Sequence, residues 1–267
     1  MKGSGTILQA KKHTLTVEKG ELLLETTLLA GKIMIENGAD MARVDDTLKR
    51  IAQNSEITAP EIFETTTGIM MSIPGHNAQV KAIARRQIDL ERIAMVNEIS
   101  RAYQAKQVDL TQMHEYLKNL DKSAPDFKLI WLILGAGTVG ATLEIMYGGS
   151  WSDLLPTFLI SALGYYVFYA INTRFKVKFA SEFLAALVIG LCALFAVKFR
   201  LGQDYGMIII GSVMPLVPGV PLTNAVRDLL AGHILSGSAR VVEALLTAVA
   251  LGMGIACVLR FWKLGGL

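Results

Sequence analysis

Three polar side chains near the C-terminal end of the chain have types and spacing that suit the binding of a small charged molecule. Asn224, Arg227 and Asp228 would share one face of a helix, because residues three and four apart are neighbours on a helix surface. An arginine can hold a carboxylate through two parallel hydrogen bonds. An aspartate can pair with an ammonium group or carry a proton, so the three residues are candidates to bind a zwitterion or a dicarboxylate.

A broken apolar segment precedes these residues. Pro215, Pro218 and Pro221 recur at every third position, and Gly219 lies between the last two. Proline lacks a backbone donor and clashes with the preceding turn, so this stretch does not fit in one straight helix. In a membrane, such backbone must be sheltered by protein or line a wet cavity, as it does at the substrate sites of transporters. We predict that these four residues break the helix or gate the site.

An amphipathic helix lying at the membrane surface is the competing interpretation of the same stretch. Its polar side would hold Arg227 and Asp228 in water. Its apolar side would consist of Leu222, Val226, Leu229, Leu230 and Ile234. The sequence leaves both interpretations open.

Three glutamates, Glu144, Glu182 and Glu243, lie within or beside apolar segments. A charged group in a bilayer is costly and usually faces a helix-bundle interior or a cavity, which makes these residues candidates to couple transport to an ion. Each also lies close to the end of an apolar segment, so the alternative is that the side chain reaches the lipid headgroups.

The elements that position these residues divide into two parts. Residues 1–125 hold 16 Lys and Arg and 16 Asp and Glu, whereas the remaining 142 residues hold 10 and 7. This division predicts a soluble domain over 1–125 and a membrane domain over 126–267. The net charge of +3 is scattered, without a basic patch interleaved with aromatic residues, which excludes nucleic acid as a partner.

The soluble part is predicted to be an α+β domain. Apolar residues at helical spacing predict helices over 17–37, 40–53, 87–106 and 109–120. Residues 56–86 are rich in β-branched side chains and turn residues, which predicts two or three strands in an antiparallel meander.

The membrane part is predicted to be a bundle of about five transmembrane helices, the fourth of them broken at the prolines. The apolar segments are Leu129–Tyr147, Leu154–Ile171, Phe179–Val197, Tyr205–Val220 and Val241–Leu259. Basic residues follow the second segment but not the first, so we expect the N-terminal domain on the cytoplasmic side of a multi-pass protein. The polar N-terminal residues do not form a cleavable signal peptide.

The sequence carries no motif for a metal, a cofactor or an enzymatic reaction. Cys192 and Cys257 lie in apolar runs and the four histidines are dispersed, so no metal-ligand spacing exists. A nucleophile elbow, a phosphate loop and an HExxH pair are also missing. We therefore expect neither an enzyme nor a bound cofactor.

Three sequence blocks resemble a known family. They are Gly38–Thr47 (GADMARVDDT), Leu90–Arg101 (LERIAMVNEISR) and Pro218–Asp228 (PGVPLTNAVRD). These blocks, which occur along the chain in the same order as in the family, resemble the N-terminal-type component of the threonine/serine exporter family. The resemblance implies a plasma-membrane (inner-membrane) exporter of threonine and serine or, in split members, of succinate-like dicarboxylates. It also implies a smaller transmembrane partner subunit, and it adds weight only to the third block as a site.

The resulting hypothesis is a subunit of a secondary exporter that lies in the lipid bilayer, binds a small-molecule substrate and assembles with its partner into an oligomer. Two alternatives stay open. One is a membrane-anchored enzyme whose cytosolic domain is catalytic, and the other is a regulatory or scaffold subunit that transports nothing itself.

Overall fold

The chain forms two compact units. The computed structural model describes residues 3–55, 60–84, 87–123, 127–175 and 177–264. The first unit consists of Met1–Ala124 with Val220–Val241, and the second of Pro125–Gly219 with Val242–Leu267. The predicted boundary between residues 125 and 126 lies outside the described residues, and a division into two domains at that point stays a prediction. The sequence did not indicate that Val220–Val241 belongs with the N-terminal residues.

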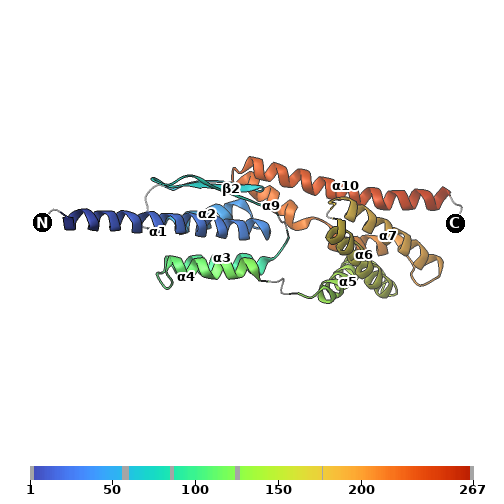
Figure 1. Cartoon of the computed structure of the whole chain (residues 1–267). Helices are drawn as coiled ribbons and strands as arrows, with labels where there is room; N and C mark the ends of the chain where they lie inside the picture. The colour runs from blue at the N-terminus through green and yellow to red at the C-terminus, as the bar shows by residue number, and fades with distance from the viewer. Residues whose placement is uncertain (1–2, 56–59, 85–86, 124–126, 176, 265–267) are drawn as a thin grey trace. The chain divides into compact units, whose positions relative to one another are not determined.

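The first unit contains most of the polar helices and the only sheet of the described residues (Figure 1). Its elements are α1 (Gly3–Glu36), α2 (Met41–Gln53), β1 (Glu61–Thr65), β2 (Gly68–Ser72), β3 (Gln79–Ala82), α3 (Leu90–Gln104), α4 (Leu110–Lys122) and α9 (Gly219–Leu230), which begins one residue before this unit does. The predicted α+β composition is confirmed, although α1 begins well before the expected residue 17.

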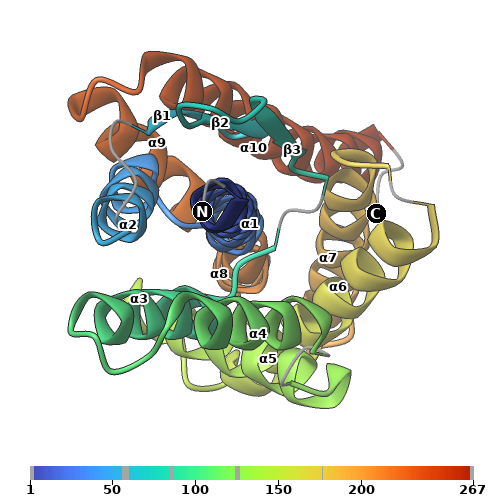
Figure 2. The same cartoon turned by 60° about the vertical axis from the view of Figure 1, so that its left-hand side comes forward.

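Helix α1 lies at the centre of the first unit, with the sheet on one side and α3 and α4 on the other (Figure 2). Its side chains Leu23, Leu24 and Ile33 are fully buried. The three strands pair in the order β1-β2-β3, each antiparallel to the next, as the predicted meander requires. Side chains alternate between the faces of a strand, so Ile69 and Met71 are buried while Met70 between them is exposed.

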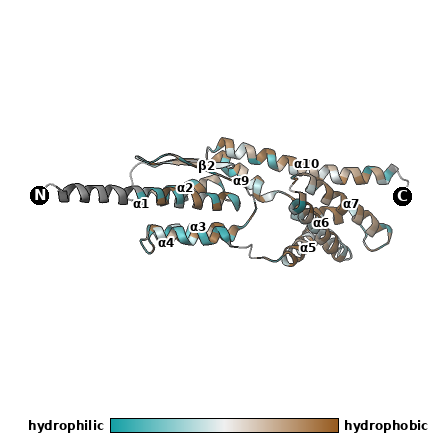
Figure 3. Cartoon of the chain, in the orientation of Figure 1, coloured by the Kyte–Doolittle hydropathy of each residue, from teal (hydrophilic) through white to brown (hydrophobic). Residues whose placement is uncertain are grey.

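The second unit is built from apolar helices, which Figure 3 colours mostly brown. They are α5 (Leu129–Met146), α6 (Leu154–Phe175), α7 (Ala180–Lys198), α8 (Tyr205–Val213), the short 3-10 helix η1 (Met214–Leu216) and the part of α10 (Ile234–Leu264) that follows Val241. Within the described residues, four helices are long and apolar enough to cross a membrane, and a fifth span exists if a bent pair counts as one. The predicted number of about five agrees with this.

The bent pair is the segment that carries the three prolines. Tyr205–Leu216 and Gly219–Leu230 meet at an angle of 58°. Pro215 lies within η1, Pro218 lies in the break, and Gly219 and Pro221 lie in the first turn of α9. The role of these four residues in breaking or gating the span stays a prediction.

Glycines allow α10 to approach α7 closely within the second unit. A Cβ atom added to Gly254 would lie 2.5 Å from the carbonyl oxygen of Phe183 and 2.9 Å from the Cβ of Ala186. A Cβ atom added to Gly252, half a turn away on the same helix, would meet no atom within 4 Å. These two positions form a matched pair for testing this contact, since small residues at such interfaces allow helix backbones to pack together.

We expect Gly254→Ala to destabilise the protein by about 1–3 kcal/mol, the usual cost of overpacking, because the backbones of α7 and α10 must separate. Gly252→Ala should leave stability unchanged or raise it by up to about 1 kcal/mol, because alanine favours the helix over glycine. The measurement is the thermal unfolding midpoint of each detergent-purified variant. Equal midpoints for the two variants would show that these helices do not pack as described.

Candidate functional site

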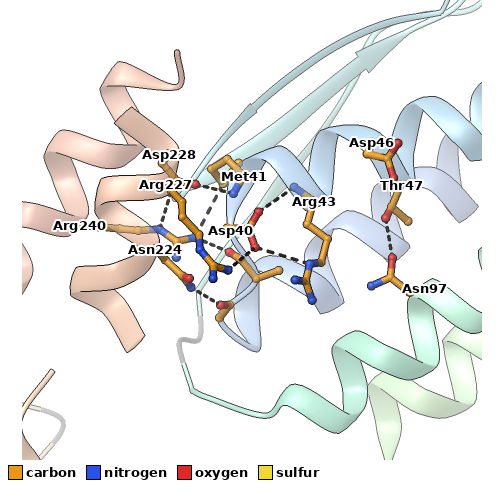
Figure 4. A network of polar contacts seen from close by, with 12 residues as sticks. Asp40, Met41, Arg43, Asp46, Thr47, Asn97, Asn224, Arg227, Asp228 and Arg240 are labelled. Carbon is orange, nitrogen blue, oxygen red and sulfur yellow. Dashed lines mark hydrogen bonds and ion pairs between the residues drawn. The ribbon is translucent and has the colours of Figure 1, made fainter. Parts of the chain in front are cut away.

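The sequence block Gly38–Thr47 and the part of the third block from Val220 to Asp228 lie against each other within the first unit (Figure 4). Oδ1 of Asp228 accepts a hydrogen bond of 2.7 Å from the backbone N–H of Met41, 187 residues away in sequence. The side-chain amide of Asn224 donates a hydrogen bond of 2.8 Å to the carbonyl oxygen of Gly38. The polar face of α9 therefore contacts the turn between α1 and α2.

The turn between α1 and α2 is shaped for this contact. Gly38 has a φ of +90°, a backbone conformation that glycine adopts without steric cost. Asp40 then caps α2 by accepting a hydrogen bond from the backbone N–H of Arg43 at 3.0 Å. The N–H of Met41 belongs to the first turn of α2, where backbone donors have no partner inside the helix. Asp228 supplies that partner, and its negative charge is favoured at the positive end of the helix dipole.

A buried ion pair completes the contact. Nε of Arg240, in the first part of α10, lies 3.2 Å from Oδ2 of Asp228. Nη2 of Arg240 donates a hydrogen bond of 2.6 Å to the carbonyl oxygen of Ala39. Asp228 is fully buried and Arg240 is 9% exposed. We call the set Asn224, Asp228 and Arg240, with the backbone of Gly38–Met41, the Asp228 clasp.

A second group of charges surrounds Asp40 beside the clasp. Nε of Arg43 lies 3.5 Å from Asp40 Oδ2, and Nη1 of Arg227 lies 4.0 Å from the same oxygen. These two arginine side chains are 49% and 64% exposed. With Arg240, three guanidinium groups face the two carboxylates of Asp40 and Asp228. The cluster therefore has more positive than negative charge, and its exposed part could accept an anion.

The structure separates the three predicted binding residues into two kinds. Asn224 and Asp228 are buried and have partners in the turn between α1 and α2, whereas the Arg227 side chain is 64% exposed and reaches Asp40 only at 4.0 Å. The competing interpretation, a surface helix with both charges in water, fits Arg227 and does not fit Asp228. A binding role for all three residues stays a prediction.

Sequence reasoning did not include Asp40, Arg43 and Arg240 among the site residues. Asp40 and Arg43 lie in a sequence block that had been singled out, but as a resemblance and without a role. Arg240 stands at the edge of an apolar segment, where a charge is unusual. Their association with α9 depends on contacts between distant parts of the chain, which residue spacing alone does not reveal.

The three glutamates predicted as coupling residues lie in the second unit, and their surroundings differ. Glu182 on α7 accepts a hydrogen bond of 2.8 Å from the Ser181 hydroxyl. Glu243 on α10 forms an ion pair with Lys178. Glu144 on α5 is fully buried, and neither of its carboxyl oxygens has a hydrogen-bond partner among the described residues. The structure does not bring the three together at one place.

A further carboxylate lies beside the turn that joins α9 to α10. Oε1 of Glu64, on β1, is 3.8 Å from Nδ1 of His233, and the Glu64 side chain is 7% exposed. Burial raises the pKa of Glu64, and repulsion from Asp45 on α2 raises it further. Attraction to His233 opposes these two effects.

Comparison of the sequence with known proteins identifies the family of this chain. Residues 25–262 match the model of the ThrE family, which is described as a threonine/serine exporter family. No solved structure matches the chain.

Two kinds of relative are similar to this chain. "Probable succinate transporter subunit YjjP" of Escherichia coli is 25% identical over 254 residues, which cover 93% of this chain and 98% of that protein. "Probable threonine/serine exporter" of Mycobacterium tuberculosis is 22% identical over 245 residues, which cover 89% of this chain and 46% of that protein. "Threonine/serine exporter" of Corynebacterium glutamicum is 22% identical over 200 residues, covering 72% and 40% respectively. The chain thus spans less than half of the two exporters and nearly all of the E. coli subunit.

We expect Asp228→Ala to destabilise the first unit by about 3–5 kcal/mol, because it removes the carboxylate that the buried Arg240 faces. Arg227→Ala should cost less than about 1 kcal/mol, because an exposed ion pair contributes little. The measurement is the unfolding free energy or midpoint of the two purified variants. A loss of equal size in both would contradict the assignment of Asp228 to a structural clasp.

The raised pKa of Glu64 predicts a pH dependence. The folded state holds this proton more tightly than the unfolded state, whose pKa is near 4.5. Its contribution to stability is therefore fully present below that value and is lost as the pH rises through the folded-state pKa. Glu64→Gln mimics the protonated acid, so the variant should match the wild type near pH 4 and unfold at a higher temperature near pH 7.

The control for this experiment is Glu91→Gln, at an exposed position on α3. It should give the same difference from the wild type at both pH values. If Glu64→Gln behaved in the same pH-independent way, burial would not be controlling the Glu64 carboxyl.

Proposed function

Because this chain belongs to the ThrE family of threonine/serine exporters, we propose that it is a subunit of a secondary exporter of small hydrophilic metabolites that carry a carboxylate. The family and the four or five apolar helices make it a multi-pass membrane protein. The observation that carries the proposal is the exposed pair Arg43 and Arg227, which share the single carboxylate of Asp40.

Arg227 is the residue best placed to receive the substrate. Its guanidinium group is 64% exposed, and its contact with Asp40 is 4.0 Å long, so little attraction is lost when an anion replaces it. Arginine holds a carboxylate with two parallel hydrogen bonds, which fixes the orientation of the ligand. Asn224 and Asp228 then act mainly by holding α9, and with it Arg227, against the turn between α1 and α2.

The residues around Arg227 favour both substrate classes that the relatives' names contain. In a succinate-like dicarboxylate, the second carboxylate would find the guanidinium of Arg43. In a threonine- or serine-type amino acid, the ammonium group would find the carboxylate of Asp40. Both classes share the carboxylate that Arg227 binds, and the second group of the ligand distinguishes them.

A second, smaller membrane subunit of the same family is part of the proposal. The chain covers 98% of an E. coli protein named as a transporter subunit and 46% of an M. tuberculosis exporter. The word subunit in the name of the E. coli relative supports a transporter made of more than one polypeptide. We place the complex in the plasma (inner) membrane with the N-terminal domain in the cytoplasm, as the basic residues after the second span favour.

The break before α9 is proposed as the gating element. Pro215, Pro218, Gly219 and Pro221 occupy the stretch where the helix axis turns by 58°. Helices interrupted in this way are the elements that change conformation around the substrate in other transporters.

The test is efflux of labelled succinate and labelled threonine from cells that express this chain together with its smaller partner. Arg227→Ala should lower efflux of the transported compound by about tenfold or more, because a hydrogen bond to a charged group contributes about 1.5–3 kcal/mol. Arg227→Lys should retain part of the activity, since it keeps the charge and loses the two-pronged geometry.

The matched control is Arg101→Ala, at an exposed position on α3, which should export at the wild-type rate. Equal amounts of each variant must be present in the membrane fraction. Wild-type efflux by Arg227→Ala under these conditions would refute the site. Efflux with the partner alone would instead identify this chain as a regulatory or scaffold subunit.

A further inference from the structure

A buried polar cluster lies where α5, α6 and α8 meet in the second unit. Three side-chain atoms there are fully enclosed and have no hydrogen-bond partner among the described residues: both carboxyl oxygens of Glu144 on α5 and Oγ1 of Thr157 on α6. A Cβ atom added to Gly211 on α8 would lie 2.6 Å from Cβ of Glu144 and 2.8 Å from Cγ2 of Thr157. The two side chains are therefore neighbours against the same glycine.

Glycines make the space for this carboxyl group. A Cβ atom on Gly149, in the turn after α5, would overlap the Glu144 carboxyl, and one on Gly211 would lie 2.7 Å from the carbonyl oxygen of Gly140. Larger residues at these positions would push the helices apart or displace the acid. The enclosure of Glu144 thus follows from close backbone packing around it.

No positive side chain of the described residues pairs with Glu144. Helix α5 contains no other charged residue, and α8 contains none. The nearby charge is Asp153, just before α6, which is itself buried and accepts hydrogen bonds from the backbone N–H groups of Gln203 and Asp204. A negative charge on Asp153 would repel one on Glu144, so Asp153 does not compensate for the missing positive partner.

The other two glutamates of the membrane helices each have a partner. Glu182 has the hydroxyl of Ser181, and Glu243 has the ammonium group of Lys178. Glu144 is therefore the one of these three glutamates that has neither a hydrogen-bond nor an ion-pair partner among the described residues. An ionised group in such surroundings loses its hydration without compensation. A protonated carboxyl has one O–H donor. Thr157 packs against the same glycine as Glu144, and its Oγ1, an acceptor, also has no partner among the described residues.

We propose that Glu144 and Thr157 form a proton-binding site at the contact of α5, α6 and α8, and that loading and release of this proton drives export. This inference rests on the proposed function, because it names the coupling ion of the same transporter. The proton resides on a Glu144 oxygen, the loaded O–H turns to donate a hydrogen bond to Thr157 Oγ1, and the proton leaves to water when the helices separate.

The first experiment measures the proton directly, on the complete two-subunit complex. Infrared difference spectra between acidic and alkaline pH should contain the carbonyl band of a protonated, buried carboxyl group. Glu144→Gln should remove one component of that band, to which the buried Glu64 on β1 also contributes, and the exposed-site variant Glu91→Gln should leave every component unchanged. A band unchanged in Glu144→Gln would overturn the proposal.

The second experiment separates coupling from transport in proteoliposomes. Glu144→Gln is nearly isosteric and neutral, so the protein should fold, as an unchanged unfolding midpoint would verify. It should exchange labelled succinate or threonine across the membrane within about twofold of the wild type and lose accumulation driven by a pH gradient by tenfold or more. Thr157→Val should shift the pH profile of driven transport to more acidic values, because the protonated acid loses its acceptor.

Each outcome separates this inference from the proposed function. If the wild type itself exchanges neither substrate, the proposed function fails. If the wild type exchanges substrate and Glu144→Gln still accumulates it on a pH gradient, the function stands and the proton site is refuted. Accumulation that depends on a sodium gradient at equal pH on both sides and is lost in Glu144→Gln would show that the cluster binds Na⁺ and would overturn the proton site.

Discussion

The buried carboxylate of Asp228 is the constraint on which the site depends. A fully enclosed charge is tolerated only with strong partners, and here three partners come from two distant places in the chain. They are the amide of Met41 at the start of α2, the guanidinium of Arg240 on α10 and the dipole of α2 itself. Because these partners are far apart in sequence, satisfying Asp228 holds the turn between α1 and α2 against α9 and the beginning of α10.

Neighbouring residues of α9 have different roles in this arrangement. Asp228 and Asn224 are engaged with the protein and maintain the position of the helix, whereas Arg227 remains exposed beside Asp40 and Arg43. An anion-binding group is more effective when its support does not move. The excess of guanidinium over carboxylate groups gives the exposed part a net attraction for anions, which suits the carboxylate shared by the substrates named for the relatives.

In the second unit, one buried carboxyl group differs from Asp228 because it has no charged partner among the described residues. Glu182 and Glu243 have partners, as a carboxylate at membrane depth requires, while Glu144 is enclosed by glycine-mediated packing without one. This difference in partners is the reason that the proposed proton site lies at Glu144 and not at the other two glutamates.

Local regularities in the sequence were enough to predict the classes of element. The spacing of apolar residues identified α2, α3, α4 and the membrane helices, and β-branched residues between turns identified the meander, because the periods of helix and strand are local properties. Helical spacing likewise placed Asn224, Arg227 and Asp228 on one face. Only the tertiary structure decided that Asp228 is buried and Arg227 exposed, that Val220–Val241 joins the first unit, and that Glu144 differs from Glu182 and Glu243. Burial and pairing depend on which distant segments pack together, and residue spacing within one segment does not predict this packing.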